Sequence, residues 1–308
     1  MAFRVLASDP LDPAAVAAMR AAGLEVDEKT DLTPEGLANV IGEYDAIVVR
    51  SATKVRTPIL DAGSRLKLVV RAGVGLDNVD VEYAEKKGIA VRNTPAASSN
   101  SVAELALGHV LSLARHIGRG TASVKNGRWE KKALKGIEID GKTLGIVGIG
   151  RIGRALAGKA AALGMRVIAF DAYVETSPEP ELVEMVPMDR LLVESDFISL
   201  HVPFDPKVGP VLGAAELGKA KDGVRIVNCA RGGVVDEEAL VEAMESGKVA
   251  GAALDVFSTE PPTTRSEAIL GMENVSFTPH VGASTVEAQA RVGAEAAQIV
   301  IDFARSNA

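Results

Sequence analysis

Short apolar, β-branched runs alternate with amphipathic segments along the chain, a pattern typical of parallel sheets covered by helices. In the first part it predicts strands at 3–7, 24–26, 45–50, 66–71 and 89–92, and helices at 13–22, 34–42 and 79–87. The alternation restarts near residue 142, with strands predicted at 143–147, 166–170, 196–201, 224–228, 251–255 and 275–278. A last helix is predicted at about 285–304. We therefore expect an α/β protein with two doubly wound parallel-sheet domains.

Two segments between these series break the rhythm. Residues 98–116 predict a long amphipathic helix, which we expect to be a hinge between the domains. Residues 118–140 are rich in Gly and Lys, show little periodicity and contain the only tryptophan, Trp129. Long irregular segments are often functional, so we interpret this one as a functional or interface loop.

Composition and charge narrow the function classes. The 308 residues, 47% of them hydrophobic, suffice for two domains with sizeable cores. The net charge of −7 argues against nucleic acid or a membrane surface as a partner. The single cysteine, Cys229, excludes an internal disulfide and fits a reducing cytosol, and no signal peptide or membrane span is predicted. We expect a cytoplasmic protein without a metal site, because four histidines and one cysteine show no metal-ligand spacing.

A glycine motif, GIGRIG at 148–153, lies between a predicted strand and a predicted helix. Gly148 would permit a tight turn, Gly150 would let the backbone approach a pyrophosphate, and Gly153 would let helix and strand pack closely. Asp171 ends the next strand, where a carboxylate can bond the ribose hydroxyls, and no nearby arginine suits a 2′-phosphate. An ordinary glycine-rich turn is the alternative, but the strand-to-helix context favours NAD binding.

The equivalent turn of the first half lacks glycines. Residues 8–13 carry two aspartates and two prolines, a poor cradle for phosphate. Only the second half is therefore expected to hold the cofactor.

Three later strands of the second half end in residues suited to catalysis. Arg231 offers a planar fork for a carboxylate, and His280 can take and return a proton near neutral pH. Glu260 could hold and stabilise the imidazolium form of that histidine. Together they predict an enzyme that transfers a hydride from a hydroxy acid, with Arg231 binding the acid group and His280 removing the hydroxyl proton. Taken singly, each could be a surface cation, a solvated acid or a turn residue.

These motifs resemble a known family. The segments GIGRIG, NCARGGVVDEEAL, AALDVFSTEPP and TPHVGAST are similar to successive signatures of the D-isomer-specific 2-hydroxy-acid dehydrogenases. The segments VVRSATKV, RAGVGLDNVD, NTPAASSNSVAEL and GRWEKKALKG are most similar to its phosphoglycerate dehydrogenase branch. The resemblance implies a flavodoxin-like substrate domain at 1–95 plus 283–308, a Rossmann NAD-binding domain at 96–282, and a homodimer.

The resemblance also assigns site residues by motif. It gives the catalytic role to Arg231, Glu260 and His280. It places at the substrate Arg50, Ser51, Arg71, Gly73, Val74, Asn93 and Lys131. It places at the cofactor Gly148, Gly150, Arg151, Ile152, Gly153, Asp171, His201, Val202, Pro203, Cys229, Ala230, Asp255 and Gly282. Cys229 is interpreted as a small buried hydrophobe, and His109 and His116 as helix residues, one partly buried and one exposed.

The basic residues Arg50, Arg71 and Lys131 favour a phosphorylated acid as substrate. We therefore expect NAD-dependent oxidation of 3-phosphoglycerate to 3-phosphohydroxypyruvate, the entry to serine biosynthesis. The alternative is a glyoxylate or hydroxypyruvate reductase, or another D-2-hydroxy-acid dehydrogenase. A formate dehydrogenase would carry Gln in place of Glu260. A non-catalytic NAD-sensing binding protein is a further alternative, and feedback by serine through an added domain is not expected because the sequence ends after the last helix.

Overall fold

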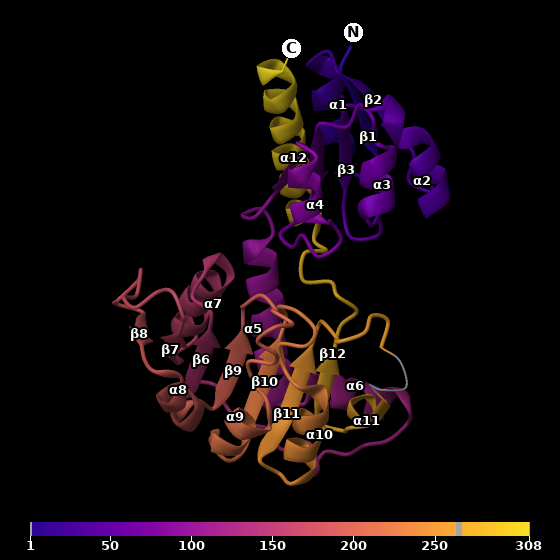
Figure 1. Cartoon of the computed structure of the whole chain (residues 1–308). Coiled ribbons are helices and arrows are strands. Elements are labelled where there is room, and N and C mark those ends of the chain that lie inside the picture. The colour runs from indigo at the N-terminus through magenta and orange to yellow at the C-terminus, as the bar shows by residue number, and fades with distance from the viewer. Residues whose placement is uncertain (1, 263–266, 308) are drawn as a thin grey trace. The chain divides into compact units, whose positions relative to one another are not determined.

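The computed structural model describes residues 2–262 and 267–307, which form two compact units. One unit comprises Met1–Ser98 and Ala283–Ala308, and the other comprises Ser99–Gly282 (Figure 1). Each unit is an α/β fold with one parallel sheet of its own, so the expected fold class is confirmed.

The first unit has a five-stranded sheet in the order β2-β1-β3-β4-β5. Its strands are β1 (Arg4–Ala7), β2 (Glu25–Glu28), β3 (Ala46–Val49), β4 (Leu68–Arg71) and β5 (Ala90–Asn93). Its helices are α1 (Pro13–Ala21), α2 (Pro34–Val40), α3 (Thr57–Ala62), α4 (Val81–Lys86) and α12 (Val286–Ser306), with a 3₁₀ turn η1 (Ile41–Glu43). Alternate strand residues face opposite sides: Val48 packs in the cluster with α1 and α12, and Ile47 in the cluster with α2, α3 and α4. Both faces of the sheet are therefore buried, as parallel sheets require.

The second unit has a seven-stranded sheet in the order β12-β11-β10-β9-β6-β7-β8. Its strands are β6 (Thr143–Val147), β7 (Arg166–Phe170), β8 (Val183–Met185), β9 (Phe197–Leu200), β10 (Val224–Asn228), β11 (Val249–Leu254) and β12 (Val275–Phe277). Its helices are α5 (Ser99–Arg115), α6 (Ile117–Lys125), α7 (Arg151–Ala162), α8 (Met188–Glu194), α9 (Ala214–Lys219), α10 (Glu237–Glu245) and α11 (Glu267–Leu270). Residues of α5 and α7 pack in one core cluster, and residues of α8, α9 and α10 in another.

The strand order predicts where each unit would bind a ligand. In the second sheet the order reverses between β6 and β9, and in the first between β1 and β3. Open α/β sheets bind ligands at the carboxyl ends of the strands beside such a reversal. Across the described residues, no helix is long and apolar enough to cross a membrane.

One sequence interpretation is wrong. Residues 118–140 were expected to be irregular, but α6 occupies the start of this segment. The helix contains Gly118 and Gly120, and its apolar residues Ile117 and Val124 are 54% and 59% exposed. With two glycines and only two large apolar residues, α6 gives a weak helix signal in the sequence. His116, predicted to end the preceding helix, instead separates α5 from α6 with a left-handed φ of 53°.

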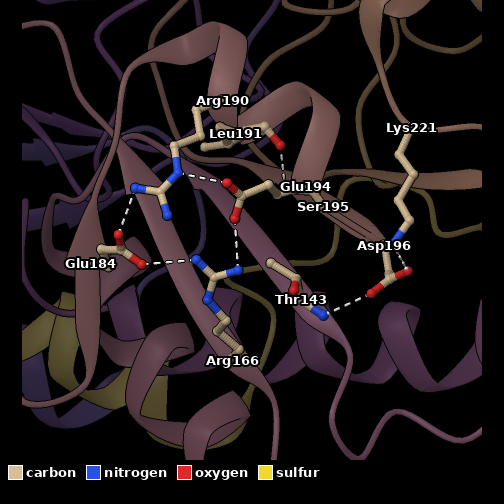
Figure 2. A network of polar contacts seen from close by, with 9 residues as sticks. All are labelled: Thr143, Arg166, Glu184, Arg190, Leu191, Glu194, Ser195, Asp196 and Lys221. Carbon is tan, nitrogen blue, oxygen red and sulfur yellow. Dashed lines mark hydrogen bonds and ion pairs between the residues drawn. The ribbon is translucent and has the colours of Figure 1, made fainter.

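A polar network links the amino ends of several strands in the second sheet (Figure 2). Arg166 and Arg190 each bind both Glu184 and Glu194, with N–O distances between 2.6 and 2.8 Å. The hydrogen bond from Arg166, followed by that from Arg190, lowers the pKa of Glu184. All four side chains are between 30% and 47% exposed, so this ring adds little to the free energy of folding.

Asp196, in the same network, is more deeply placed, with a side chain 20% exposed. Its Oδ2 accepts the Thr143 N–H at 2.9 Å, and Lys221 Nζ donates to its Oδ1 at 2.8 Å. Burial opposes ionisation of this carboxyl, but the bonds from Lys221 and Thr143 outweigh it and lower the pKa. Asp196 therefore fixes the first residue of β6 to the start of β9.

Replacing Asp196 with Ala should lower the free energy of unfolding by about 1–3 kcal/mol, because the buried Thr143 N–H loses its acceptor. Urea unfolding followed by circular dichroism measures this. The matched variant Glu184→Gln breaks only exposed ion pairs and should shift the urea midpoint of unfolding far less. Equal shifts for the two variants would contradict the role given to Asp196.

Candidate active site

The register of the second sheet brings its strand ends into one row. Val147 pairs with both Phe170 and Leu200, and Asn228 pairs with both Leu200 and Leu254. Leu254 pairs in turn with Phe277. The residues that follow these strands therefore share one edge: Gly148, Asp171, His201, Cys229, Asp255 and Thr278. The sheet thus places side by side the segments that the sequence predicted to line a nucleotide site.

The glycine loop has the shape that a dinucleotide needs. Gly148 has a φ of +95°, and a Cβ there would lie 2.7 Å from the carbonyl oxygen of His201. A Cβ on Gly153 would collide with the carbonyl oxygen of Gly148. Gly150 is the N-cap of α7, and a Cβ there would meet no described atom within 4 Å. In the described part of the chain no side chain caps this helix, so its N–H groups and positive dipole end suit a pyrophosphate.

Asp171 follows β7 and is half-buried. Its Oδ2 accepts the Ile149 N–H at 2.9 Å, and its Oδ1 accepts the Tyr173 N–H at 2.9 Å. A carboxylate has about four acceptor positions, so ribose hydroxyls can still be bound. Asp171 therefore also holds the glycine loop, a role that the sequence did not suggest.

His201 follows β9 directly across from the glycine loop. Burial lowers the pKa of His201 to about 4, so the ring is neutral at neutral pH. Its Nε2 lies 2.9 Å from Ser199 Oγ. Its Nδ1 is buried and has no hydrogen-bond partner among the described residues. A buried ring nitrogen with no hydrogen-bond partner among the described residues fits a site that receives a polar ligand.

Asn228 shapes the turn that carries Arg231. This buried amide donates to the Arg231 carbonyl at 2.9 Å and accepts the Ala230 N–H at 3.0 Å. Between them Cys229 is 6% exposed, and burial, with a smaller effect of Asp255, raises the pKa of its thiol. Such a thiol behaves as a small apolar group, as the sequence predicted. One Arg231 N–H donates to the Ala230 carbonyl at 2.6 Å, which orients the guanidinium.

Asp255 is the most enclosed acid of the row, with 1% of the residue exposed. Its Oδ1 accepts the Thr278 hydroxyl at 2.6 Å and the Val281 N–H at 2.8 Å, and its Oδ2 accepts the Gly282 N–H at 2.9 Å. The Asp255 carbonyl accepts the His280 N–H at 2.8 Å. This single residue therefore defines the turn that carries His280.

Glu260 and His280 form a hydrogen-bonded pair. Glu260 Oε2 lies 2.7 Å from His280 Nδ1, and its Oε1 accepts the Phe257 N–H at 3.2 Å. Since the carboxylate accepts from Nδ1, the other ring nitrogen, Nε2, is the atom that can exchange a proton with a substrate. The His280 side chain is 49% exposed, so it is accessible.

The pair borders a cavity of about 500 Å³. Its walls are largely apolar and include Phe257, Pro261, Leu270 and Phe277. A mainly apolar cavity with a few convergent polar groups is the usual form of a small-molecule site.

The first unit has a second row of predicted site residues at the carboxyl edge of its sheet. Arg71 pairs with both Val49 and Asn93, so Arg50, Arg71 and Asn93 lie at neighbouring strand ends. Asn93 donates from Nδ2 to the Val74 carbonyl at 2.6 Å.

Gly73 makes room for Arg71. Its φ is +147°, and a Cβ there would overlap the Arg71 guanidinium. The backbone conformation therefore favours glycine at this position, and any side chain there would also displace the Arg71 guanidinium.

Two residues that the sequence did not single out hold the loop after β3. Asp9 is 3% exposed, and its carboxylate accepts the N–H groups of Arg50 and Thr53. Asn78 donates from Nδ2 to the carbonyls of Arg50 and Thr53 at 2.7 and 2.6 Å. From the sequence, Asp9 is expected only to be unsuited to binding a phosphate. Its position after the first strand, next to the reversal of strand order between β1 and β3, could have indicated a role in this loop.

Other predicted residues lie outside these two rows. Lys131 is exposed in a turn after α6, and Ser51 and Pro203 are exposed loop residues. No group of three or more His, Cys, Asp or Glu in the described ranges could hold a metal ion.

Comparisons with known proteins give the chain a family. Residues 107–282 match the model of the D-isomer specific 2-hydroxyacid dehydrogenase, NAD binding domain. The chain is 53% identical to a hydroxypyruvate reductase of Thermotoga maritima over 296 residues, covering 95% of each. It is 46% identical to the human D-3-phosphoglycerate dehydrogenase over 98% of the chain, but spans only 56% of that relative's length.

Solved structures agree with this. A glyoxylate reductase of Paecilomyes thermophila superimposes with a TM-score of 0.86 at 32% identity, covering 99% of this chain and 95% of that one. The expected family and the expected NAD cofactor are thus confirmed. The strand-edge geometry and these similarities together show that the chain belongs to the D-isomer specific 2-hydroxyacid dehydrogenases, NAD-dependent enzymes acting on small 2-hydroxy acids.

Proposed function

We propose that this dehydrogenase interconverts hydroxypyruvate and D-glycerate. The Glu260–His280 pair beside a largely apolar cavity is the observation that carries the reaction. The substrate is supported by similarity to a hydroxypyruvate reductase along almost the whole of both chains. This reverses the order expected from the sequence, in which oxidation of 3-phosphoglycerate came first.

His280 is the proposed acid and base. In reduction, its Nε2–H donates a proton to the carbonyl oxygen of the 2-oxo acid, and in oxidation Nε2 takes the hydroxyl proton back. Glu260 stabilises the imidazolium through Nδ1 and fixes the ring. NADH supplies the hydride that reaches the substrate carbon.

Arg231 is proposed to bind the carboxylate of the substrate, because its guanidinium is always charged and can form two parallel hydrogen bonds. Arg50, Arg71 and Asn93 in the first unit are proposed substrate contacts. For the cofactor, Gly150 and the N-terminus of α7 are proposed to bind the pyrophosphate, and Asp171 the ribose.

A second candidate, oxidation of 3-phosphoglycerate, is favoured by Arg50 and Arg71, two cations at adjacent strand ends. The similarity to phosphoglycerate dehydrogenases also supports it, although the chain spans about half their length. A homodimer stays a prediction from the family. A non-catalytic NAD sensor would bind NADH without turning over any 2-oxo acid.

A substrate panel separates these functions. With NADH, kcat/KM for hydroxypyruvate should exceed that for glyoxylate, pyruvate and 3-phosphohydroxypyruvate, measured by the loss of absorbance of NADH. A value at least tenfold higher for the phosphorylated acid would instead establish the second candidate. Absence of turnover with every acid would leave the sensor as the remaining reading.

Replacing His280 with Asn should lower kcat by roughly 10²–10⁴-fold while the Kd for NADH is unchanged, because only proton transfer is lost. Asn tolerates the left-handed backbone of this site. His116→Asn is a matched control, since His116 also has a positive φ. Turnover of His280→Asn within threefold of the parent would refute the acid–base role.

Replacing Gly150 with Ala tests the pyrophosphate site. The new Cβ would have no described atom within 4 Å, so thermal stability should be kept, but it enters the space proposed for the pyrophosphate. The Kd for NADH, measured by calorimetry, should rise at least tenfold, equivalent to about 1.4 kcal/mol. Gly158→Ala, in the same helix and equally unobstructed, should bind NADH normally. Unchanged affinity in Gly150→Ala would place the pyrophosphate elsewhere.

A further inference from the structure

His109 on α5 is a buried imidazole for which the proposed reaction has no use. Only 3% of the residue is exposed. Burial lowers the pKa of His109, partly opposed by the charge of Asp255. A buried polar ring is normally satisfied by its neighbours, and those neighbours show what it does.

Both ring nitrogens of His109 contact the strand that leads to His280. Nδ1 lies 3.1 Å from Ser276 Oγ, and Nε2 lies 3.1 Å from Thr278 Oγ1. Ser276 belongs to β12, and Thr278 follows it directly. His109 therefore ties the middle of α5 to the last residues before the catalytic turn.

The direction of these bonds follows from Asp255. The Thr278 hydroxyl donates its one hydrogen to Asp255 Oδ1 at 2.6 Å. Thr278 Oγ1 can then only accept from His109, so the ring carries a hydrogen on Nε2. The chain of donors thus runs from His109 through Thr278 to the Asp255 carboxylate.

That carboxylate is shared between Thr278 and the turn after it. Its Oδ1 also accepts the Val281 N–H, and its Oδ2 accepts the Gly282 N–H. His280, which lies between Thr278 and Val281 in the chain, has a left-handed φ of 54°. Such a backbone costs energy for a residue with a side chain and persists only where neighbouring bonds enforce it. The orientation of the Asp255 carboxylate therefore governs where the His280 ring lies.

We propose that His109 is a positioning residue for the reaction: through Thr278 it holds the Asp255 carboxylate in the orientation that places His280 against Glu260. This rests on the proposed role of His280 as acid and base. His109 itself touches neither substrate nor cofactor in this scheme. If it only filled space in the core, an apolar side chain of similar size would serve as well.

The test compares His109→Leu with His109→Gln. Leu keeps the bulk and removes the donor, whereas the Gln amide can still donate to Thr278 Oγ1. We expect His109→Leu to lower kcat roughly 10- to 100-fold with KM and the Kd for NADH nearly unchanged, the size of effect that a small displacement of a reacting group produces. His109→Gln should recover kcat to within about threefold of the parent.

Val110→Ala is the matched control. Val110 is fully buried in the same helix, so its truncation destabilises the protein without touching the donor chain. Its kcat, measured well below its Tm, should equal that of the parent. Equal losses of kcat in His109→Leu and Val110→Ala, or no recovery in His109→Gln, would overturn the proposal. If His109→Leu does not fold, Thr278→Val against Thr278→Ser tests the same bond.

A substrate-independent readout separates this proposal from the proposed function. The chain has four histidines, so ¹³C-labelled imidazoles give few signals, and His280→Asn assigns that of His280. The His280 signal should shift or broaden in His109→Leu and stay unchanged in Val110→Ala. An unaltered signal would overturn the positioning role even if the parent enzyme reduces hydroxypyruvate. An altered signal in a protein that turns over no 2-oxo acid would overturn only the proposed function.

Discussion

A buried carboxyl group is costly unless its oxygens accept hydrogen bonds, and the site depends on this constraint at Asp255. The residue is 1% exposed, and a hydroxyl and two backbone N–H groups converge on its side chain. If the carboxylate is to be satisfied, the chain from Thr278 to Gly282 must fold around it. His280 is thereby fixed in a left-handed conformation beside Glu260. The first unit uses the same device, since buried Asp9 orders the loop that carries Arg50.

Sheet topology decides where such carboxylates can act. Parallel strands in register bring their carboxyl ends to one edge, and the reversal of strand order leaves a gap there for a ligand. In the second unit the glycine loop and His201 flank the reversal, so close that a Cβ on Gly148 would meet the His201 carbonyl. The rigid sheet thus fixes where the strand ends lie, and the short loops that follow, held by hydrogen bonds, carry the residues proposed to react. The ion pairs of Figure 2 lie near the opposite, amino ends of the strands.

The sequence predicted the parts that local pattern encodes. Spacing in the sequence pointed to the glycine motif, to Asp171 and to the three residues Arg231, Glu260 and His280. The strands that precede them were predicted to within a few residues of their observed bounds. Contacts between distant segments were not readable in this way. Asn78 reaches the Arg50 carbonyl across 28 residues, and His109 reaches Thr278 across 169. The α6 helix was not predicted because its two glycines lower the helix propensity of a segment with only two large apolar residues. The sequence motifs also do not distinguish a phosphorylated from an unphosphorylated acid as substrate, since Arg50 and Arg71 attract either anion.

Hydrogen exchange at the Val281 and Gly282 amides tests most directly whether the Asp255 carboxylate builds the catalytic turn. An Asp255→Asn variant keeps the size of the side chain but replaces one acceptor with a donor. In the parent both amides should be protected, and in the variant at least one should exchange ten or more times faster, while the amides of β10 keep their protection. Equal protection of Val281 and Gly282 in the two proteins would show that the turn holds its shape without the carboxylate, and would contradict this account.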